Sequence, residues 1–374
     1  MARDPMDRAR ELAERGRYTT APNPLVGVVV ARDGKVIGEG WHARAGGRHA
    51  EVMALEACGG AARGATLYAT LEPCNHHGRT PPCTDAIVSS GVSSVVIGHL
   101  DPDPRMRGRS VEILRDAGVE VTVVEDAVFA RQNEQFFHLM STGRPFVHLK
   151  LAMTLDGRIA ASGGDSKWVT GEAARTRAHE LRAEAGAVLI GARTARTDDP
   201  LLTARGLYEA SAVTRVVLDP RLTLSAGSRL ALSAREAPVA VFAREEALGG
   251  REGELRERGV EVFPAPRDGE GLDLGFVLDE LGRRGLRGVL VEGGGETAGR
   301  FVAGGLVDKL TLFYAPKMLG SEGVPAVGAL KAAHVSDASG FCVESVERLE
   351  EDVSLTLYPR EAPCPEEEYV HRSG

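Results

Sequence analysis

Apolar and polar residues alternate along the chain with the periods of helices and strands, in a repeated order. Apolar runs at 25–31 and 35–41, separated by Arg32-Asp33-Gly34, predict two antiparallel strands joined by a turn. Residues 4–16 precede them with a helical spacing of apolar positions. Further helices are predicted at 49–58, after Cys83, at 111–117 and at 127–140, and further strands at 66–71, 92–97 and 119–124. This order is typical of an α/β domain.

A second series of strands and helices follows a predicted linker at residues 143–145. Gly143 ends the preceding helix, and Pro145 cannot continue it. Apolar segments beyond the linker predict the strands of a mainly parallel sheet: 146–151, 187–190, 215–218, 239–242, 260–263 and 288–291. The pattern therefore predicts two domains, residues 1–143 and 146–360, and a frayed tail at 361–374.

Length and composition indicate a globular protein with a small-molecule substrate. The 374 residues exceed the length that one hydrophobic core usually supports. No apolar run approaches the length of a membrane span, and the N-terminus lacks the apolar core of a secretory signal. We therefore expect a cytoplasmic protein with no membrane partner. The net charge of −8 argues against a broad nucleic-acid surface.

One histidine and two cysteines have the chemistry of a zinc site. His49 begins a predicted helix, Cys74 follows a predicted strand, and Cys83 lies nine residues further on. One imidazole and two thiolates suit tetrahedral zinc with the fourth position left for water, as in catalytic sites. Glu51, two residues after His49, would lie close to the metal without binding it. The pattern predicts that Glu51 is a catalytic proton shuttle beside a zinc-activated water.

The loop between the two cysteines leaves alternatives open. Zinc deaminases of amino-substituted pyrimidines and purines have histidine-x-glutamate followed by proline-cysteine-x-x-cysteine. Here eight residues, instead of two, separate Cys74 from Cys83. The loop contains His76 and His77, either of which could be a fourth ligand that makes the site structural. It also contains Arg79, which suits a bidentate contact with a substrate phosphate.

Several longer motifs resemble one known family. They are Thr20-Ala21-Pro22-Asn23-Pro24, His49-Ala50-Glu51, the segment LEPCNHHGRTPPC at 71–83, and Asp101-Pro102. Over roughly residues 5–358 the chain is similar to the bifunctional riboflavin-biosynthesis deaminase/reductase, in which the long loop between the cysteines is specific among zinc deaminases. The resemblance implies an N-terminal cytidine-deaminase-like α/β/α domain followed by a dihydrofolate-reductase-like α/β domain. We also expect a homo-oligomer.

The resemblance implies two reactions on a phosphoribosylaminopyrimidine. The first domain would deaminate diaminohydroxyphosphoribosylaminopyrimidine to 5-amino-6-(5-phosphoribosylamino)uracil, and the second would reduce the ribosyl group to ribityl with NADPH. The family's zinc ligands carry over to His49, Cys74 and Cys83, and its proton shuttle to Glu51. Its deaminase substrate contacts fall on Asn23, His42, His76, Arg79 and Asp101.

One segment departs from the family pattern. After Asp101-Pro102 the family usually has asparagine-proline and then a small, glycine-rich stretch. This chain has Asp103, followed by arginines at 105, 107 and 109. These arginines either hold phosphate or are solvated surface, and both alternatives stay open at this point.

In the second half, candidate ligand-binding residues follow predicted strands, at the edge where open α/β sheets bind ligands. Trp168, in a polar loop, is either a stacking platform for a nucleotide ring or a core anchor. Glycines at 293–295 follow an apolar strand and open a helix, where backbone amides can approach a pyrophosphate and positive φ angles are common.

By resemblance, the NADP contacts fall on Ala152, Trp168, Thr194, Asp198, Gly294, Gly295, Glu296, Thr297, Ala298, Gly299 and Arg300. The reductase substrate contacts fall on Ser166, Arg182, Leu202, Arg205 and Glu292. The forks of Arg182 and Arg205 suit the ribose phosphate. No residue of these sets is a compelling general acid, so we expect hydride transfer to rely on positioning.

Two other functions explain less of the pattern. A zinc-stabilised nucleotide-binding regulator would have no need for Glu51 beside the metal. A deaminase with an inactive second half would have no need for the glycine loop and Trp168.

Overall fold

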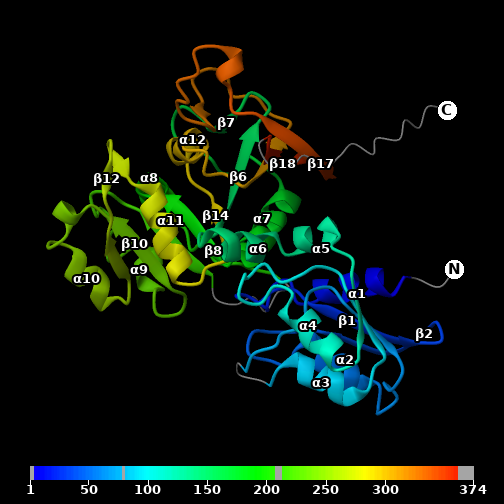
Figure 1. Cartoon of the computed structure of the whole chain (residues 1–374). Helices are drawn as coiled ribbons and strands as arrows, with labels where there is room; N and C mark the ends of the chain where they lie inside the picture. Colours follow the sequence, from blue (N-terminus) through cyan, green and yellow to red (C-terminus); the bar gives the residue numbers. More distant parts are fainter. Residues whose placement is uncertain (1–3, 78–80, 207–212, 361–374) are drawn as a thin grey trace, which may run out of the picture. The chain divides into compact units, whose positions relative to one another are not determined.

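The computed structural model describes residues 4–77, 81–206 and 213–360, which divide into two compact units (Figure 1). Unit 1 contains the described residues up to Pro145 and the segment Leu281–Arg287. Unit 2 contains the other described residues. Within these ranges, no helix is long and apolar enough to cross a membrane.

Unit 1 is built on a five-stranded sheet in the order β2-β1-β3-β4-β5. The strands are β1 (Gly27–Arg32), β2 (Lys35–Trp41), β3 (Thr66–Ala69), β4 (Ser94–Ile97) and β5 (Glu120–Val123). β1 pairs antiparallel with β2 and β3, whereas β3, β4 and β5 are parallel. The predicted hairpin is confirmed, with Asp33 and Gly34 both at positive φ in its turn.

Helices cover both faces of this sheet. They are α1 (Pro5–Glu14), α2 (Ala50–Ala57), α3 (Cys83–Ser90), α4 (Arg109–Asp116), α5 (Ala127–Gln132) and α6 (Glu134–Thr142). Side chains alternate along β1, so Val28 and Val30 pack in one core with α2, α3 and α4, whereas Val29 packs against α1 on the other side. Unit 1 therefore has the expected α/β/α layers.

The prediction of one continuous helix over residues 127–140 is wrong. The helix is interrupted at Asn133, between α5 and α6. The Asn133 side chain accepts a hydrogen bond from Leu25 N at 2.7 Å and donates one to Leu25 O at 2.9 Å. The asparagine therefore pairs with the segment just after Asn23, which local helical periodicity does not reveal.

Unit 2 is built on a nine-stranded sheet in the order β11-β10-β9-β8-β14-β6-β15-β18-β17. Its strands are β6 (Phe146–Thr154), β8 (Ala187–Gly191), β9 (Thr214–Leu218), β10 (Val239–Ala243), β11 (Glu261–Pro264), β14 (Gly288–Val291), β15 (Lys309–Ala315), β17 (Phe341–Leu349) and β18 (Asp352–Pro359). The six predicted strands are confirmed and are parallel, as is β15, whereas β18 and β17 form an antiparallel hairpin at one edge.

Helices and short strands connect the sheet of unit 2. The helices are α7 (Glu172–Ala185), α8 (Ala192–Asp198), α9 (Arg229–Leu232), α10 (Glu252–Glu257), α11 (Leu274–Arg283), which continues into unit 1, and α12 (Gly295–Ala303), with 3-10 turns η1 (Glu245–Ala247) and η2 (Val335–Asp337). The short strands are β7 (Arg158–Ala160), β12 (Arg267–Asp268), β13 (Gly271–Leu272) and β16 (Val324–Pro325).

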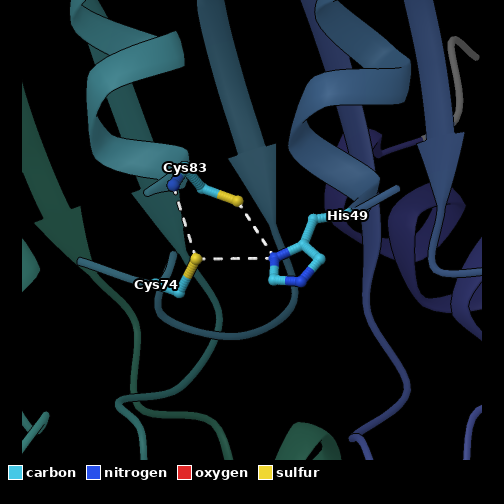
Figure 2. Close-up of side chains that lie close together, drawn as sticks. All are labelled: His49, Cys74 and Cys83. Carbon is cyan, nitrogen blue, oxygen red and sulfur yellow. Dashed lines mark hydrogen bonds between the residues drawn. The ribbon is translucent and has the colours of Figure 1, made fainter. Parts of the chain in front are cut away.

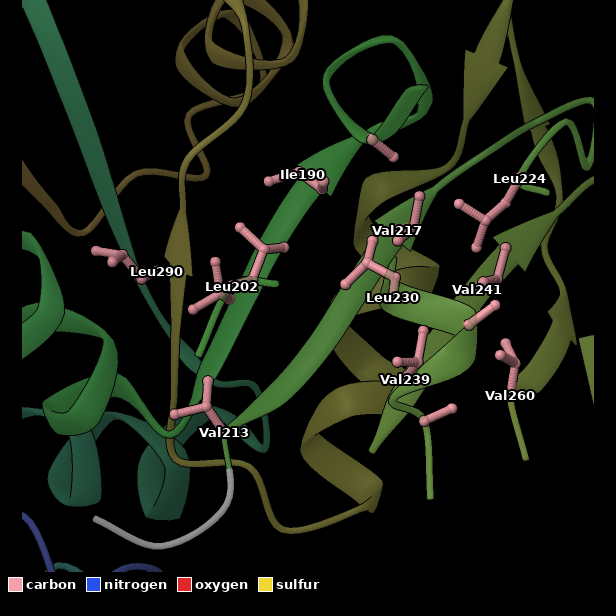
Figure 3. Packing of buried hydrophobic residues seen from close by; sticks show 14 of the residues in the cluster. Ile190, Leu202, Val213, Val217, Leu224, Leu230, Val239, Val241, Val260 and Leu290 are labelled. Carbon is pink, nitrogen blue, oxygen red and sulfur yellow. The ribbon is translucent and has the colours of Figure 1, made fainter. Parts of the chain in front are cut away.

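Buried aliphatic side chains of β8, β9, β10 and β14 form the main core of unit 2 (Figure 3). Ile190, Val217, Val241 and Leu290 are completely buried within it. Continuous burial of these strands explains their unbroken apolar runs. Because β8, β14 and β6 are adjacent and parallel, their carboxyl ends meet at one edge of the sheet. The predicted second site follows this edge.

Candidate functional site

Three potential metal ligands meet in unit 1 (Figure 2). His49 is the N-cap residue of α2, Cys83 is the first residue of α3, and Cys74 lies in the loop after β3. Their ligand atoms all lie within 4.8 Å of one another. His49 Nδ1 is 3.2 Å from Cys83 Sγ and 3.4 Å from Cys74 Sγ. Two helix N-termini and one loop thus bring together the residues that the sequence pattern singled out.

The donor set of this cluster fits zinc. One imidazole nitrogen and two sulfurs are three of the four ligands of a tetrahedral site, which leaves one position for water. His76 and His77 are exposed, and the cluster formed by the described residues does not include them. The arrangement therefore favours the open, catalytic alternative over a closed structural site.

The polar surroundings of Cys74 favour its thiolate form. Cys83 N donates to Cys74 Sγ at 3.4 Å, at the start of α3. Hydrogen bonds from the Cys83 and His49 side chains, together with this backbone bond, lower the pKa of Cys74. A thiolate is the form of cysteine that binds metals.

Glu51 lies in the first turn of α2 and is only 4% exposed. Burial raises the pKa of its carboxyl group to about 7, and the nearby Cys74 contributes in the same direction. A carboxyl group with this pKa can both accept and donate a proton near neutral pH. Its environment therefore suits a proton shuttle next to the cluster.

Asn23 and His42 form one hydrogen-bonded pair beside the cluster. His42 Nδ1 lies 3.0 Å from Arg48 O, so its proton is best placed there, and Nε2 accepts from Asn23 Nδ2 at 3.1 Å. Burial lowers the pKa of His42, which keeps the ring neutral. The centroids of the His42 and His49 rings are 5.5 Å apart. Asn23 is thus linked to the cluster through His42.

Asp101 is half-buried, and burial raises its pKa to about 6. Its Oδ1 accepts a hydrogen bond from Asp103 N at 2.8 Å. Asp103, whose side chain is 14% exposed, in turn accepts from Arg105, and Arg107 pairs with Glu125. Arg105 and Arg107 are exposed and each is paired with a carboxylate of the chain, which favours the solvated-surface alternative. The predicted phosphate contact Arg79 lies outside the described residues.

The second predicted set follows the carboxyl ends of β6, β8 and β14 in unit 2. Gly294 is the N-cap residue of α12, and a Cβ on it would lie 3.7 Å from Thr194 Oγ1 on α8. The glycine loop and α8 therefore adjoin. Gly294 has φ −68, so the expectation of a positive φ angle is wrong at this residue. Ala152 is half-buried near the end of β6, on the strand beside β14.

Trp168 is 64% exposed, so the core-anchor alternative is wrong. Its ring is covered on one face by Arg175, whose Cζ is 4.7 Å from the ring centroid. Lys317 Nζ donates to Trp168 O and Val169 O, both at 2.9 Å. Desolvation raises the pKa of Asp198, in the last turn of α8, and the charge of the nearby Lys167 opposes this rise. The loop of the half-buried Ser166 therefore approaches α8 and presents an aromatic ring to solvent.

Glu292 and Arg182 are paired with each other in the structure. Arg182 donates to both carboxylate oxygens of Glu292, at 2.5 and 2.9 Å, and also to Thr203 O. The Arg182 guanidinium group, which the sequence analysis expected to bind the ribose phosphate, thus binds a carboxylate instead. Leu202, buried at φ 54, directly precedes Thr203, and Arg205 is exposed two residues beyond it.

Sequence reasoning missed Lys150 in this region. Its Nζ lies 3.9 Å from Glu292 Oε2, and burial lowers the pKa of the ammonium group. The available signal was a lysine within the apolar run of β6, in which neighbouring side chains are buried. A buried cation beside the predicted substrate residue Glu292 is a candidate proton donor.

Comparison with known proteins gives matches over both units. Residues 2–99 match the cytidine and deoxycytidylate deaminase zinc-binding region, and residues 145–353 match the RibD C-terminal domain. The riboflavin biosynthesis protein RibD of Aquifex aeolicus is 43% identical over 94% of this chain and 96% of its own length. The Escherichia coli protein is 39% identical over 94% of this chain and 98% of its own.

The chain belongs to the RibD family. Solved relatives agree: RibD of Acinetobacter baumannii has a TM-score of 0.87 at 37% identity, covering 95% of this chain and 98% of that one. A Thermotoga maritima structure, described as a diaminohydroxyphosphoribosylaminopyrimidine deaminase and 5-amino-6-(5-phosphoribosylamino)uracil reductase, has a TM-score of 0.83 at 39% identity and covers 95% of this chain and 97% of its own. The protein is a bifunctional deaminase and reductase of riboflavin biosynthesis, and the predicted zinc and NADPH cofactors are those of the family.

Proposed function

We propose that unit 1 hydrolyses the exocyclic amine of diaminohydroxyphosphoribosylaminopyrimidine and that unit 2 reduces the ribosyl group of the product to ribityl with NADPH. The observation that carries the first assignment is the cluster of His49, Cys74 and Cys83 with the buried Glu51 beside it. The substrate class rests on the description of the Thermotoga maritima relative.

In the deaminase, His49, Cys74 and Cys83 would hold the zinc ion. Bound zinc acidifies a water molecule and makes it a nucleophile at neutral pH. Glu51 accepts a proton from this water and delivers it to the amine nitrogen, which leaves as ammonia. The raised pKa of Glu51 suits both steps, because the same carboxyl group must take up and release a proton.

Asn23 and His42 would orient the pyrimidine ring. His42 receives a hydrogen bond from the Asn23 amide nitrogen and thereby fixes the direction of that amide. An amide side chain matches the donor and acceptor pattern of a pyrimidine edge. Asp101 and His76 complete the proposed contacts, and Arg79 is proposed to bind the phosphate.

In the reductase, NADPH supplies a hydride to the sugar carbon. The backbone amides at the start of α12, from Gly295 onward, would hold its phosphate groups. The exposed Trp168 ring would offer a stacking surface for the cofactor. Glu292, oriented by the two bonds from Arg182, contacts the ribosyl hydroxyls, and Lys150 holds a proton beside it.

Mass spectrometry of the reaction tests this assignment. The protein, loaded with zinc, is incubated with the diaminopyrimidine, with and without NADPH. Without NADPH we expect conversion of one amino group to an oxo group and release of ammonia. With NADPH the product gains two further hydrogens. An unchanged pyrimidine in the zinc-loaded protein contradicts the deaminase assignment, and a product that never gains hydrogens contradicts the reductase assignment.

We also propose that the protein forms homo-oligomers through the sheet edge at β17 and β18. Strand register places Val343, Val346, Val353, Leu355 and Leu357 on one face. Val343 and Val346 are 55% and 62% exposed, and β17 ends the strand order of the sheet. A contiguous apolar face at an open sheet edge is typical of an interface.

The cytoplasmic location stays a prediction.

Light scattering tests this interface. Val346→Lys should lower the measured molecular mass of the particle, because a charge would be buried in the apolar contact. Glu347→Lys, at the adjacent position on the opposite face of β17, is the matched control and should leave the mass unchanged. A monomeric wild-type protein would contradict the proposal.

A further inference from the structure

The Glu72 carboxylate is buried and has no part in the proposed chemistry. Glu72 is only 6% exposed, and its carboxylate accepts three hydrogen bonds from backbone N–H groups. Oε2 accepts from Asp101 N at 3.1 Å and from Gly108 N at 2.9 Å, whereas Oε1 accepts from Ser110 N at 3.0 Å. A buried charge is costly unless it is paired or hydrogen-bonded, so these three bonds hold Glu72 in one position.

Two of the three bonds cap α4 from a distant part of the chain. Gly108 is the N-cap residue of this helix and has no side chain with which to cap it. Glu72 supplies the missing acceptor, and its negative charge at the helix N-terminus is favourable. Ser110 returns a bond in the opposite direction, from its hydroxyl group to Pro73 O at 2.5 Å. Residues 72 and 73 are thus bound to the start of α4.

The third bond connects the segment that precedes Cys74 with the segment of Asp101. Cys74 follows Glu72 by two residues, and the bond to Asp101 N anchors the turn that presents the Asp101 carboxyl group. Glu72 N also donates to His99 O at 2.9 Å, so Glu72 is bonded on both sides of Leu100. The segment that carries a metal-ligand candidate and the segment that carries a substrate-contact candidate therefore share one buried carboxylate.

We infer that Glu72 is a positioning residue of the deaminase, which sets the place of Asp101 relative to Cys74 and thereby the fit of the pyrimidine substrate. This inference rests on the proposed role of Asp101. The carboxylate acts on substrate binding through the backbone of Asp101, because it contacts neither the substrate nor the leaving group. Its loss should therefore change KM rather than the proton-transfer step.

The test is Glu72→Gln, which keeps the size of the side chain but replaces one acceptor oxygen with a donor. One of the three N–H groups then faces an NH₂ group. We expect the KM for the diaminopyrimidine to rise about tenfold, the loss of one charge-assisted bond, with kcat and zinc content close to wild type. The matched control is Glu112→Gln, an exposed carboxylate in the first turn of the same helix, which should leave KM unchanged.

A double-mutant cycle separates positioning from a general structural role. In an Asp101→Ala background, Glu72→Gln should raise KM much less than in the wild type, because the residue on which it acts is gone. An equal effect in both backgrounds, or a loss of zinc with a fall in kcat, overturns the inference. If Asp101→Ala alone leaves KM unchanged, the proposed role of Asp101 fails instead.

A second variant keeps the test decisive if Glu72→Gln does not fold. Glu72→Asp retains the charge on a shorter side chain and should give a smaller rise in KM than loss of the charge. Bound zinc in the same samples reports folding of unit 1, which contains Glu72 and the metal-ligand cluster. Wild-type KM in a folded Glu72→Asp protein and in a folded Glu72→Gln protein overturns the inference.

Discussion

The proposed proton-shuttle role of the buried Glu51 can be tested by a single substitution. Glu51→Gln keeps the size of the side chain but removes the group that accepts and donates protons. Because Glu51 is outside the three-residue ligand cluster, bound zinc should remain. We expect kcat for ammonia release to fall about 10²- to 10⁴-fold. Metal analysis and ammonia release, measured on the same preparation, check this prediction.

Cys83→Ala provides the contrasting result. It removes one of the three donor atoms, so the protein should lose zinc together with deamination. A Cys83→Ala protein with full zinc content would contradict the ligand assignment. Zinc loss in the Glu51→Gln protein would contradict the shuttle assignment.

The raised pKa of Asp101 predicts that substrate binding depends on pH. Its folded-state pKa of about 6 lies above the ordinary value of 3.8, because burial disfavours the charged form. The folded protein therefore binds this proton more tightly, and the stability contribution of Asp101 is lost as pH rises from about 4 to 6. Substrate binding through hydrogen bonds to an ionised Asp101 should show the opposite pH dependence and weaken as pH falls.

We expect kcat/KM for deamination to fall as pH decreases through about 6, where Asp101 becomes protonated. In Asp101→Asn the overall value should be lower, and the part of this acidic limb near pH 6 should disappear, whereas the fall near pH 7 that comes from protonation of Glu51 should remain. Rates at constant ionic strength between pH 5 and 8 check the prediction. An unchanged acidic limb in Asp101→Asn would assign it to another group.

The sequence predicted the roles of those residues whose spacing along the chain is sufficient to identify them. His49 and Glu51 share the first turn of a helix, and the cysteines flank one loop, so local reasoning identifies them. Glu72 and Lys150 were missed because their roles depend on partners at Gly108 and Glu292, far away in the sequence. Contacts between residues far apart in the sequence determine such roles, and the pattern of residues along the chain does not reveal these contacts.

At the scale of elements, Asn133 connects the α5–α6 junction to the backbone of Leu25. Asn133→Ala leaves the N–H and C=O groups of Leu25 without their partners in a buried place. An unsatisfied buried group costs about 1–3 kcal/mol, so the free energy of unfolding should fall by at least about this amount. Urea unfolding checks the prediction. Ser141→Ala, exposed on α6, is the control and should change the value by less than about 0.5 kcal/mol.

Elements were predictable where a strand is one unbroken, buried apolar run. β15 is also largely buried but was missed, because Lys309 and Thr311 break its apolar pattern. The apolar runs of β8, β9 and β10 are buried on both faces, and each was found. β17 and β18 were missed because charged residues alternate with exposed valines along β17, and no buried run marks the hairpin. The break at Asn133 was missed for the same reason as Glu72: a distant partner causes it.

At the scale of the whole molecule, each unit contains a complete set of proposed catalytic groups. Gly294→Val should therefore abolish NADPH-dependent reduction and leave ammonia release intact. The backbone tolerates the substitution, because φ is −68 and the new Cβ meets only Thr194 Oγ1, at 3.7 Å. The added methyl groups instead occupy the space where phosphate approaches α12. Gly250→Val, with no atom within 4 Å of its Cβ position, is the control within unit 2.

Separable sites also predict that two inactive variants restore the pathway together. Glu51→Gln should reduce added deaminated pyrimidine but release no ammonia, and Gly294→Val should do the reverse. An equimolar mixture should form the reduced product from the diaminopyrimidine, because the deaminated intermediate can leave one protein and bind the other. The initial lag should shorten in proportion to total protein concentration. Mass spectrometry of the ribityl product over time checks this expectation, and a mixture that accumulates deaminated intermediate without reducing it would mean that the second reaction needs an active first site on the same chain.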